Sequence, residues 1–217
     1  MYITYIGHSC FKLQDKVGPD GVIVVTDPFD PNMTGFKMPK IDADIVTVSH
    51  DHKDHNYVKA IKGDAFVINR AGEYENKGVF VEGIDAYHDD KQGNERGNIV
   101  MFRIDIDGIS VAHLGDLGCA LETKQLEKLE GTDILLIPVG GKYTIDAKKA
   151  VSVINQIEPR IVIPMHYGDP KLKWDLDKVD KFAKEIGLQP TYEDKLKISK
   201  RDLPAEDMEL VILNKYD

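Results

Sequence analysis

The segment from residue 44 to residue 55 constrains this chain more than any other. A short apolar run, DIVTV, is followed at once by SHDHKDH, in which three histidines and an aspartate fall within six residues. The apolar run predicts a buried strand, so the polar residues lie in a loop at its carboxyl end. Sheets of α/β proteins bind ligands at that edge. We therefore expect a layered α/β fold with a functional loop at 50–55.

The spacing within this loop is typical of a metal site. A chain of random order would show H-x-H-x-D-H with a probability of about one in a thousand. His50 and His52 alternate, so in an extended loop both imidazoles project to one side and meet one cation. Asp54 and His55 then turn toward a neighbouring position. The pattern predicts two ions, and a polar surface loop without a ligand is the alternative.

Other segments must complete such a site, because two ions with open positions need about seven protein donors. His88 ends the run VFVEGIDAYH and His166 ends IVIPMH, so both follow a predicted strand. Asp116 follows the run ISVAHL, and its neighbours Gly115 and Gly118 let the backbone turn sharply beside a charged site. A carboxylate there can bridge two cations.

The remaining pattern predicts sheets covered by helices. The first half shows strands joined by turns, and the second half alternates strands with helices. A length of 217 residues with 42% hydrophobic content suits a single domain over residues 1–217. Besides the strands, we expect a Gly-Pro-Asp-Gly turn at 18–21, a brief helical stretch at 56–63, and helices at 122–130, 146–157 and 175–186.

Composition disfavours several classes of partner and compartment. The net charge of −9 opposes polyanionic partners, so nucleic acid is a disfavoured substrate. The two cysteines, Cys10 and Cys119, show no disulfide or CxxC pattern and favour a reducing compartment. Neither a signal peptide nor a run long enough to span a membrane is recognisable. We expect a cytoplasmic protein with a small-molecule substrate, no membrane partner and a homo-oligomeric state.

The order of the motifs SHDHKDH, AYH, LGD and MHYGD resembles the metallo-β-lactamase superfamily. Through GHSCF, TDPFD, LGDLG and PVGGKYTID the chain is also similar to its compact branch of Zn-dependent hydrolases, related to the ascorbate-phosphate lactonase type. The resemblance implies a four-layer αβ/βα sandwich. It also implies one metal on His50, His52 and His88, a second metal on Asp54, His55 and His166, and Asp116 between them.

Three residues are candidates for catalysis beside the metals. Asp54 would orient the attacking hydroxide as well as bind metal. His8, in GHSCF, and His113, in AHLGD, would contact substrate or carry a proton, although a packed structural histidine is the alternative for both. Asp27 ends the strand VIVVT and would hold the far nitrogen of a metal-bound imidazole, or else cap a turn before Pro28.

These residues predict a metal-dependent hydrolase. A hydroxide bridging two divalent ions would attack an ester, lactone or phosphoester of a small molecule. Zinc is the first choice of ion, with manganese or iron as alternatives. An iron-dependent oxidoreductase on the same ligands, or a metal-binding sensor without turnover, would use the same donor set.

Overall fold

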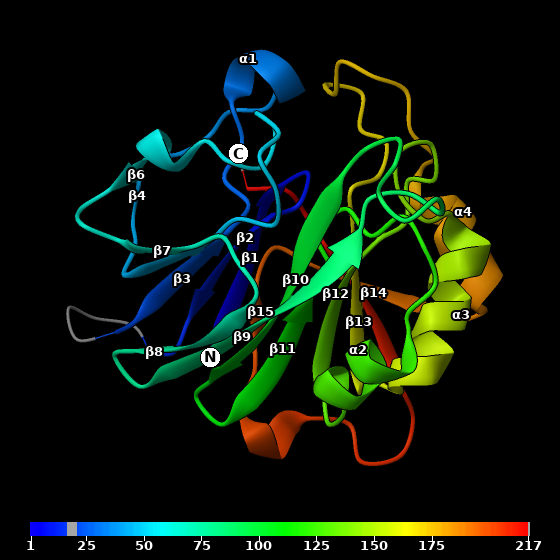
Figure 1. Cartoon of the computed structure of the whole chain (residues 1–217). Coiled ribbons are helices and arrows are strands. Elements are labelled where there is room, and N and C mark those ends of the chain that lie inside the picture. The colour runs from blue at the N-terminus through cyan, green and yellow to red at the C-terminus, as the bar shows by residue number, and fades with distance from the viewer. Residues whose placement is uncertain (17–20, 217) are drawn as a thin grey trace.

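The structure, a computed structural model, describes residues 1–16 and 21–216 and is built on two β-sheets that face each other (Figure 1). The predicted turn at 18–21 lies outside the described residues except for Gly21. In spatial order, the six-stranded sheet contains β15 (Leu196–Lys197), β1 (Tyr2–Gly7), β2 (Cys10–Gln14), β3 (Ile23–Thr26), β5 (Ile45–Thr47) and β7 (Phe66–Ile68). The eight-stranded sheet contains β14 (Pro190–Glu193), β16 (Glu209–Leu213), β13 (Ile161–Met165), β12 (Ile134–Pro138), β11 (Ile109–His113), β10 (Asn98–Ile106), β9 (Val79–Tyr87) and β8 (Gly72–Asn76).

The main core lies between the two sheets. Strands β12 and β13 are buried along their whole length and pair in parallel, as their unbroken apolar runs require. Their alternate side chains point to opposite faces of the sheet: Leu136 and Ile163 join the core between the sheets. Leu135 and Val162 pack instead under the helices.

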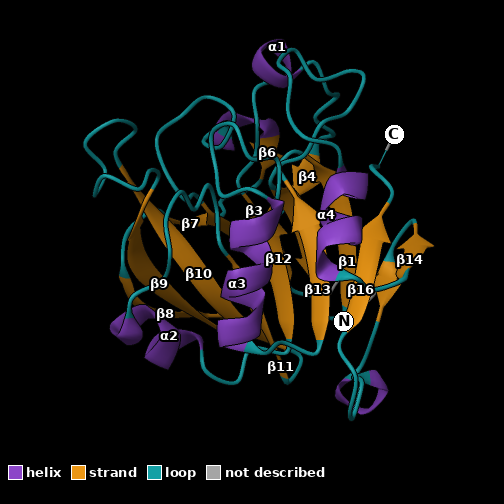
Figure 2. Ribbon diagram, turned by 90° about the vertical axis from the view of Figure 1, so that its right-hand side faces the viewer, coloured by secondary structure: helices purple, strands orange, loops and turns teal. Residues whose placement is uncertain are grey.

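Three helices cover the outer face of the eight-stranded sheet: α2 (Thr123–Leu129), α3 (Ala147–Ile157) and α4 (Val179–Ile186) (Figure 2). Helix α3 begins where the Asp146 side chain accepts a hydrogen bond from the Lys149 amide. Its buried residues recur at helical spacing and face the sheet. Helix α4 ends at Gly187, which adopts the left-handed conformation.

Short elements cover the outer face of the six-stranded sheet, over a third apolar cluster that includes Phe29 and Phe36. Helices on one side and these elements on the other give the expected four-layer sandwich. The covering elements are α1 (Pro31–Thr34), the 3₁₀ turn η1 (Val58–Ala60) and the paired strands β4 (Ile41–Asp42) and β6 (Ile61–Lys62). A second 3₁₀ turn, η2 (Lys200–Asp202), follows β15 in the chain and precedes β16.

Two predicted helices differ from the structure for tertiary reasons. The stretch 56–63 forms only η1, because its residues Ile61 and Lys62 pair with β4. The helix predicted at 175–186 begins at Val179, because the Asp177 amide bonds the Gly140 carbonyl. Strands β8 and β14 were not predicted. No helix in the described part of the chain is long and apolar enough to cross a membrane.

Candidate metal centre

The predicted donors meet at one edge of the sandwich. The loop 49–55 follows β5, while His88, Asp116 and His166 follow β9, β11 and β13. Each donor therefore stands just after a strand, as the sequence predicts. Because the two sheets face each other, donors from the first quarter of the chain come within reach of donors more than a hundred residues later.

The first group of imidazoles is His50, His52 and His88. One nitrogen from each lies within 4.8 Å of the others, and the ring centroids are 4.4 to 5.3 Å apart. The Nε2 atom of His50 is 2.9 Å from Nδ1 of His52. His52 is exposed to solvent whereas His88 is buried, so this group has an open side.

Asp116 lies at the middle of the centre and is 2% exposed. Its Oδ2 atom is 3.2 Å from Nε2 of His55, 3.3 Å from Nε2 of His166 and 3.5 Å from Nε2 of His88. Burial alone would raise the pKa of the Asp116 carboxyl, but His166 and His55 hold that pKa well below its ordinary value. Asp116 is therefore a carboxylate, placed between the two groups of imidazoles.

The donor set fits divalent cations. Within the described residues, Nε2 of His55 and Oδ1 of Asp116 are buried and make no hydrogen bond. Leaving polar atoms buried without a partner costs free energy, which a cation among them would offset. Imidazole with carboxylate is a donor combination that zinc accepts and that manganese or iron also accepts.

Asp27 fixes the loop 49–55 through hydrogen bonds to Ser49 and His55. Its side chain accepts hydrogen bonds from the Ser49 amide (2.7 Å), from Oγ of Ser49 (2.6 Å) and from Nδ1 of His55 (2.8 Å). Ser49 Oγ also lies 2.9 Å from Nδ1 of His50. Asp27 therefore orients His55 directly and His50 through Ser49, which agrees with the orienting role predicted from the sequence. Ser49 was missed, because a single serine before a histidine carries no signal.

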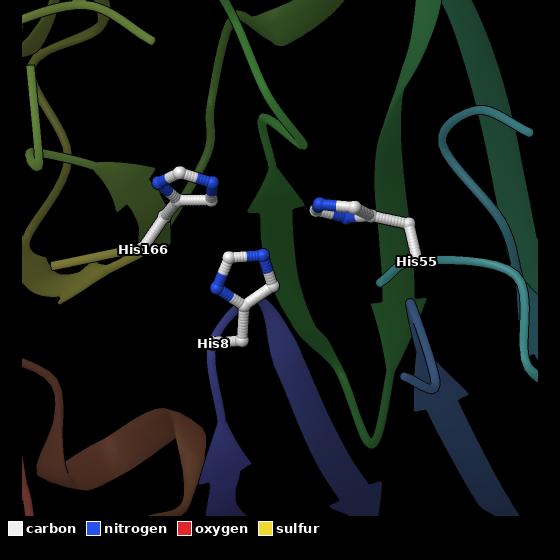
Figure 3. A group of neighbouring side chains, drawn as sticks. All are labelled: His8, His55 and His166. Atoms are coloured by element: carbon white, nitrogen blue, oxygen red, sulfur yellow. The ribbon is translucent and has the colours of Figure 1, made fainter. Parts of the chain in front are cut away.

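His55 and His166 form the second, buried group of imidazoles. Figure 3 shows the His8 ring between the rings of these two histidines. The ring centroids of His8 and His166 are 4.3 Å apart, and Nε2 of His8 is 3.1 Å from Oδ2 of Asp54. The sequence predicts that His8 contacts substrate or carries a proton, without naming a partner in the protein. The structure places its imidazole against Asp54, which supports a role in the site.

The catalytic role expected for His113 does not agree with its surroundings. Its ring is fully buried, with Nε2 bonded to the Ser9 carbonyl at 2.8 Å and Nδ1 accepting from the Gly115 amide at 3.3 Å. Both nitrogens are thereby engaged with backbone. His113 ties the GHSCF turn to the loop of Asp116, which is the structural alternative, and neither of its nitrogens is free to exchange a proton with a substrate.

Two glycines allow neighbouring loops to approach the donors closely. A Cβ on Gly118 would lie 2.3 Å from the carbonyl of His88, and one on Gly140 would lie 2.1 Å from the carbonyl oxygen of His166. Any larger residue would push those histidines out of place. The loop after His166 also carries Trp174, whose half-buried ring lies 5.7 Å from that of His8. Trp174 was not predicted; it lies directly before the helix predicted at 175–186.

Acid is expected to destabilise the metal-free protein. Burial, followed by repulsion from other histidines, lowers the pKa of His8 to about 4 and that of His50 to about 3, and burial also lowers the pKa values of His88 and His113. A histidine with a lowered folded pKa binds fewer protons than the unfolded chain, so stability falls as pH drops from 6.5 toward 4.

Among the described histidines with a shifted pKa, only His55 opposes this effect, since Asp116 and Asp27 overcome its burial and raise its pKa. Its contribution is complete below pH 6.5 and is lost as pH rises through the raised value. Urea unfolding of chelator-treated protein at several pH values measures the balance. A urea midpoint that increases as the pH is lowered from 7 to 5 would contradict the predicted loss of stability in acid.

Comparisons with known proteins agree with this arrangement. A family model described as the beta-lactamase superfamily domain matches residues 2–166. A UPF0173 metal-dependent hydrolase of Methanopyrus kandleri is 30% identical over 219 aligned residues, which cover 87% of this chain and 94% of the relative.

Solved structures give the same picture. A Thermotoga maritima protein assigned as a Zn-dependent hydrolase of the metallo-β-lactamase superfamily has 36% sequence identity and a TM-score of 0.78, over 98% of this chain and 97% of that one. A metal-dependent hydrolase from Parabacteroides distasonis, at 20% identity and a TM-score of 0.65 over 99% of this chain and 93% of that one, shares the fold. The chain thus belongs to the metallo-β-lactamase superfamily and, within it, to the UPF0173 family of metal-dependent hydrolases.

Proposed function

We propose that this metal-dependent hydrolase is binuclear and acts on an ester, lactone or phosphoester of a small molecule. The observation that supports two ions most directly is the position of Asp116, whose Oδ2 atom lies 3.2 to 3.5 Å from three imidazoles of both groups. His50, His52 and His88 would hold one ion, and Asp54, His55 and His166 the other. Zinc is the first choice for both ions.

When bound, two divalent ions would lower the pKa of a coordinated water toward neutrality and polarise the oxygen that is attacked. The chain's own residues fix the geometry of this chemistry. Asp27 orients His55, and Ser49 relays the same support to His50. Asp54 would orient the attacking water. Its carboxylate lies beside the buried rings of His8 and His55, and its side chain is 18% exposed.

The open side of the centre is at His52, so we assign substrate entry to that side. The chain has a net charge of −9 and would repel long polyanions over distances shorter than the screening length of the salt. A small molecule is therefore the better substrate, and a nuclease activity is disfavoured.

Replacing His52 with Ala tests the proposal. The variant is expected to bind one ion per chain where the wild type binds two, and to lose hydrolysis by at least about a hundredfold, since loss of even an outer partner of a metal ligand costs that much. Elemental analysis gives the metal content, and a panel of lactones, carboxylic esters and phosphoesters gives the activity.

The exposed neighbour Lys53 provides the matched control, because Lys53→Ala changes the same loop without removing a donor. This control should keep both ions and full activity. Two ions and wild-type rates in the His52 variant would exclude His52 from the site, and a single ion in the wild-type protein would exclude the binuclear centre.

A further inference from the structure

We propose that His8 is a further ligand of the ion assigned to Asp54, His55 and His166. Three imidazoles rather than two would then bind this ion. The inference rests on the proposed binuclear function and extends its donor set. His8 is 1% exposed and stands at the turn between β1 and β2, where the sequence predicts a contact with substrate or a role in proton transfer.

The spacing of the rings supports this assignment. His8 lies 4.9 Å from His55 and 4.3 Å from His166 between ring centroids. The first group shows the same spacing, 4.4 to 5.3 Å. One nitrogen each from His8, His55 and His166 lies within 4.8 Å of the others, and Figure 3 shows a nitrogen of each ring turned toward the space between them. Three imidazoles arranged in this way form a pocket for one cation.

The contacts of Asp54 agree with shared coordination. Its Oδ2 atom is 3.1 Å from Nε2 of His8 and 3.6 Å from Nε2 of His55. Donors held about 2.0 to 2.1 Å from one tetrahedral zinc lie roughly 3.3 Å from each other. Both distances fall near this value, so Asp54, His8 and His55 are spaced as donors to one ion.

The backbone fixes His8 in this position. Its φ angle of 57° is left-handed, which a histidine adopts at a cost in free energy. The carbonyl oxygen of His8 accepts hydrogen bonds from the Tyr5 hydroxyl at 3.0 Å and from the His166 amide at 2.8 Å. His8 is thereby tied directly to another donor of the same group, and the turn presents the imidazole to the centre rather than to the core.

The alternative is that His8 only donates a hydrogen bond to Asp54 from Nε2. The free Nδ1 atom of His8 does not decide between the two roles. Among the described residues it has no hydrogen-bond partner, and the same holds for Nδ1 of His88 and of His166. The two roles differ in what Nε2 carries: a ligand offers a lone pair, and a hydrogen-bond donor offers a proton.

The variant His8→Gly separates these roles. Glycine accepts the left-handed backbone without cost, so the variant is expected to fold. It leaves a space into which imidazole or 1-methylimidazole can be added; both offer a lone pair, but only imidazole can also donate a proton. We expect the variant to bind one zinc ion per chain, with the second ion weakened at least about a hundredfold. Both additives should restore the second ion, as measured by elemental analysis after dialysis against a limiting chelator.

Two results would overturn the proposal: undiminished zinc binding by His8→Gly, or restoration by imidazole alone. A crystal structure of the zinc-loaded wild type, phased on zinc anomalous scattering, decides the case if neither additive enters. A distance from His8 Nε2 to zinc near 2.1 Å supports the assignment, and one above about 3 Å excludes it. Failure here with two ions and hydrolysis intact in the wild type would leave the proposed function standing.

Discussion

The Asp116→Asn variant is expected to lose hydrolysis by at least about a thousandfold and to retain at most one tightly bound ion per chain. Removing a single group that stabilises developing charge commonly costs 10²- to 10³-fold in rate, and this carboxylate would serve two ions at once. Asn keeps the size of the side chain, so the loss would reflect charge and donor strength rather than packing. Elemental analysis and steady-state kinetics on the best substrate of the panel measure both effects.

Asp207 provides the comparison for Asp116, because it is an exposed carboxylate outside the centre. Asp207→Asn changes the net charge equally and should leave metal content and rate unchanged. Retention of two ions together with wild-type turnover in the Asp116 variant would remove Asp116 from the centre. Loss of activity with both ions retained would limit Asp116 to a role in the chemical step.

A second large effect is expected for Asp27→Asn, this time on stability. Asp27 is fully buried with a φ angle of 39°, a conformation that Asn also tolerates. Burial would raise the pKa of its carboxyl, but the hydrogen bond from His55 and the charges of His113 and His55 lower it. Asn brings two N–H groups toward donors on Ser49 and His55. Breaking such a buried charged network costs about 3 to 5 kcal/mol.

Urea unfolding of the metal-free protein measures this cost. The matched control is Asp44→Asn, since Asp44 also accepts a backbone hydrogen bond, from Ile23, and pairs with the exposed Lys77 at the surface. That exposed pair is worth about 1 kcal/mol or less. Equal destabilisation by the two substitutions would mean that the Asp27 network does no more than an ordinary surface contact. Zinc affinity of the Asp27 variant should also fall about 10- to 100-fold.

Candidate donors are easier to recognise in this sequence than the strand pairing around them. The seven candidate donors come together because each follows a strand, and the ends of strands can be recognised from short apolar runs. Pairing between distant segments cannot be recognised in this way. Strand β15 completes the six-stranded sheet beside β1, although nothing local in Leu196 and Lys197 indicates it. The polar run Gly72–Asn76 forms β8 because β9 is beside it, not because of its own composition.

The roles of the buried histidines show the same limit. The sequence suggests the same roles for His8 and His113, yet the ring of His8 lies against Asp54 and that of His113 binds two backbone groups. The difference arises from the turn after β1, which has a left-handed residue at His8. Backbone conformation of this kind depends on contacts with residues over a hundred positions away, such as the amide of His166.

The division of the donors between the two halves of the chain has a consequence for how the protein acquires its ions in the cell. During synthesis, residues 50–55 leave the ribosome roughly 5 to 20 s before His166 does, at about 5 to 20 residues per second. The strand β15, which pairs with the first strand, emerges later still. A nascent chain therefore offers an incoming ion only an incomplete set of ligands. The proposed centre would therefore be completed only when the two sheets close, so uptake of both ions would follow folding rather than accompany synthesis.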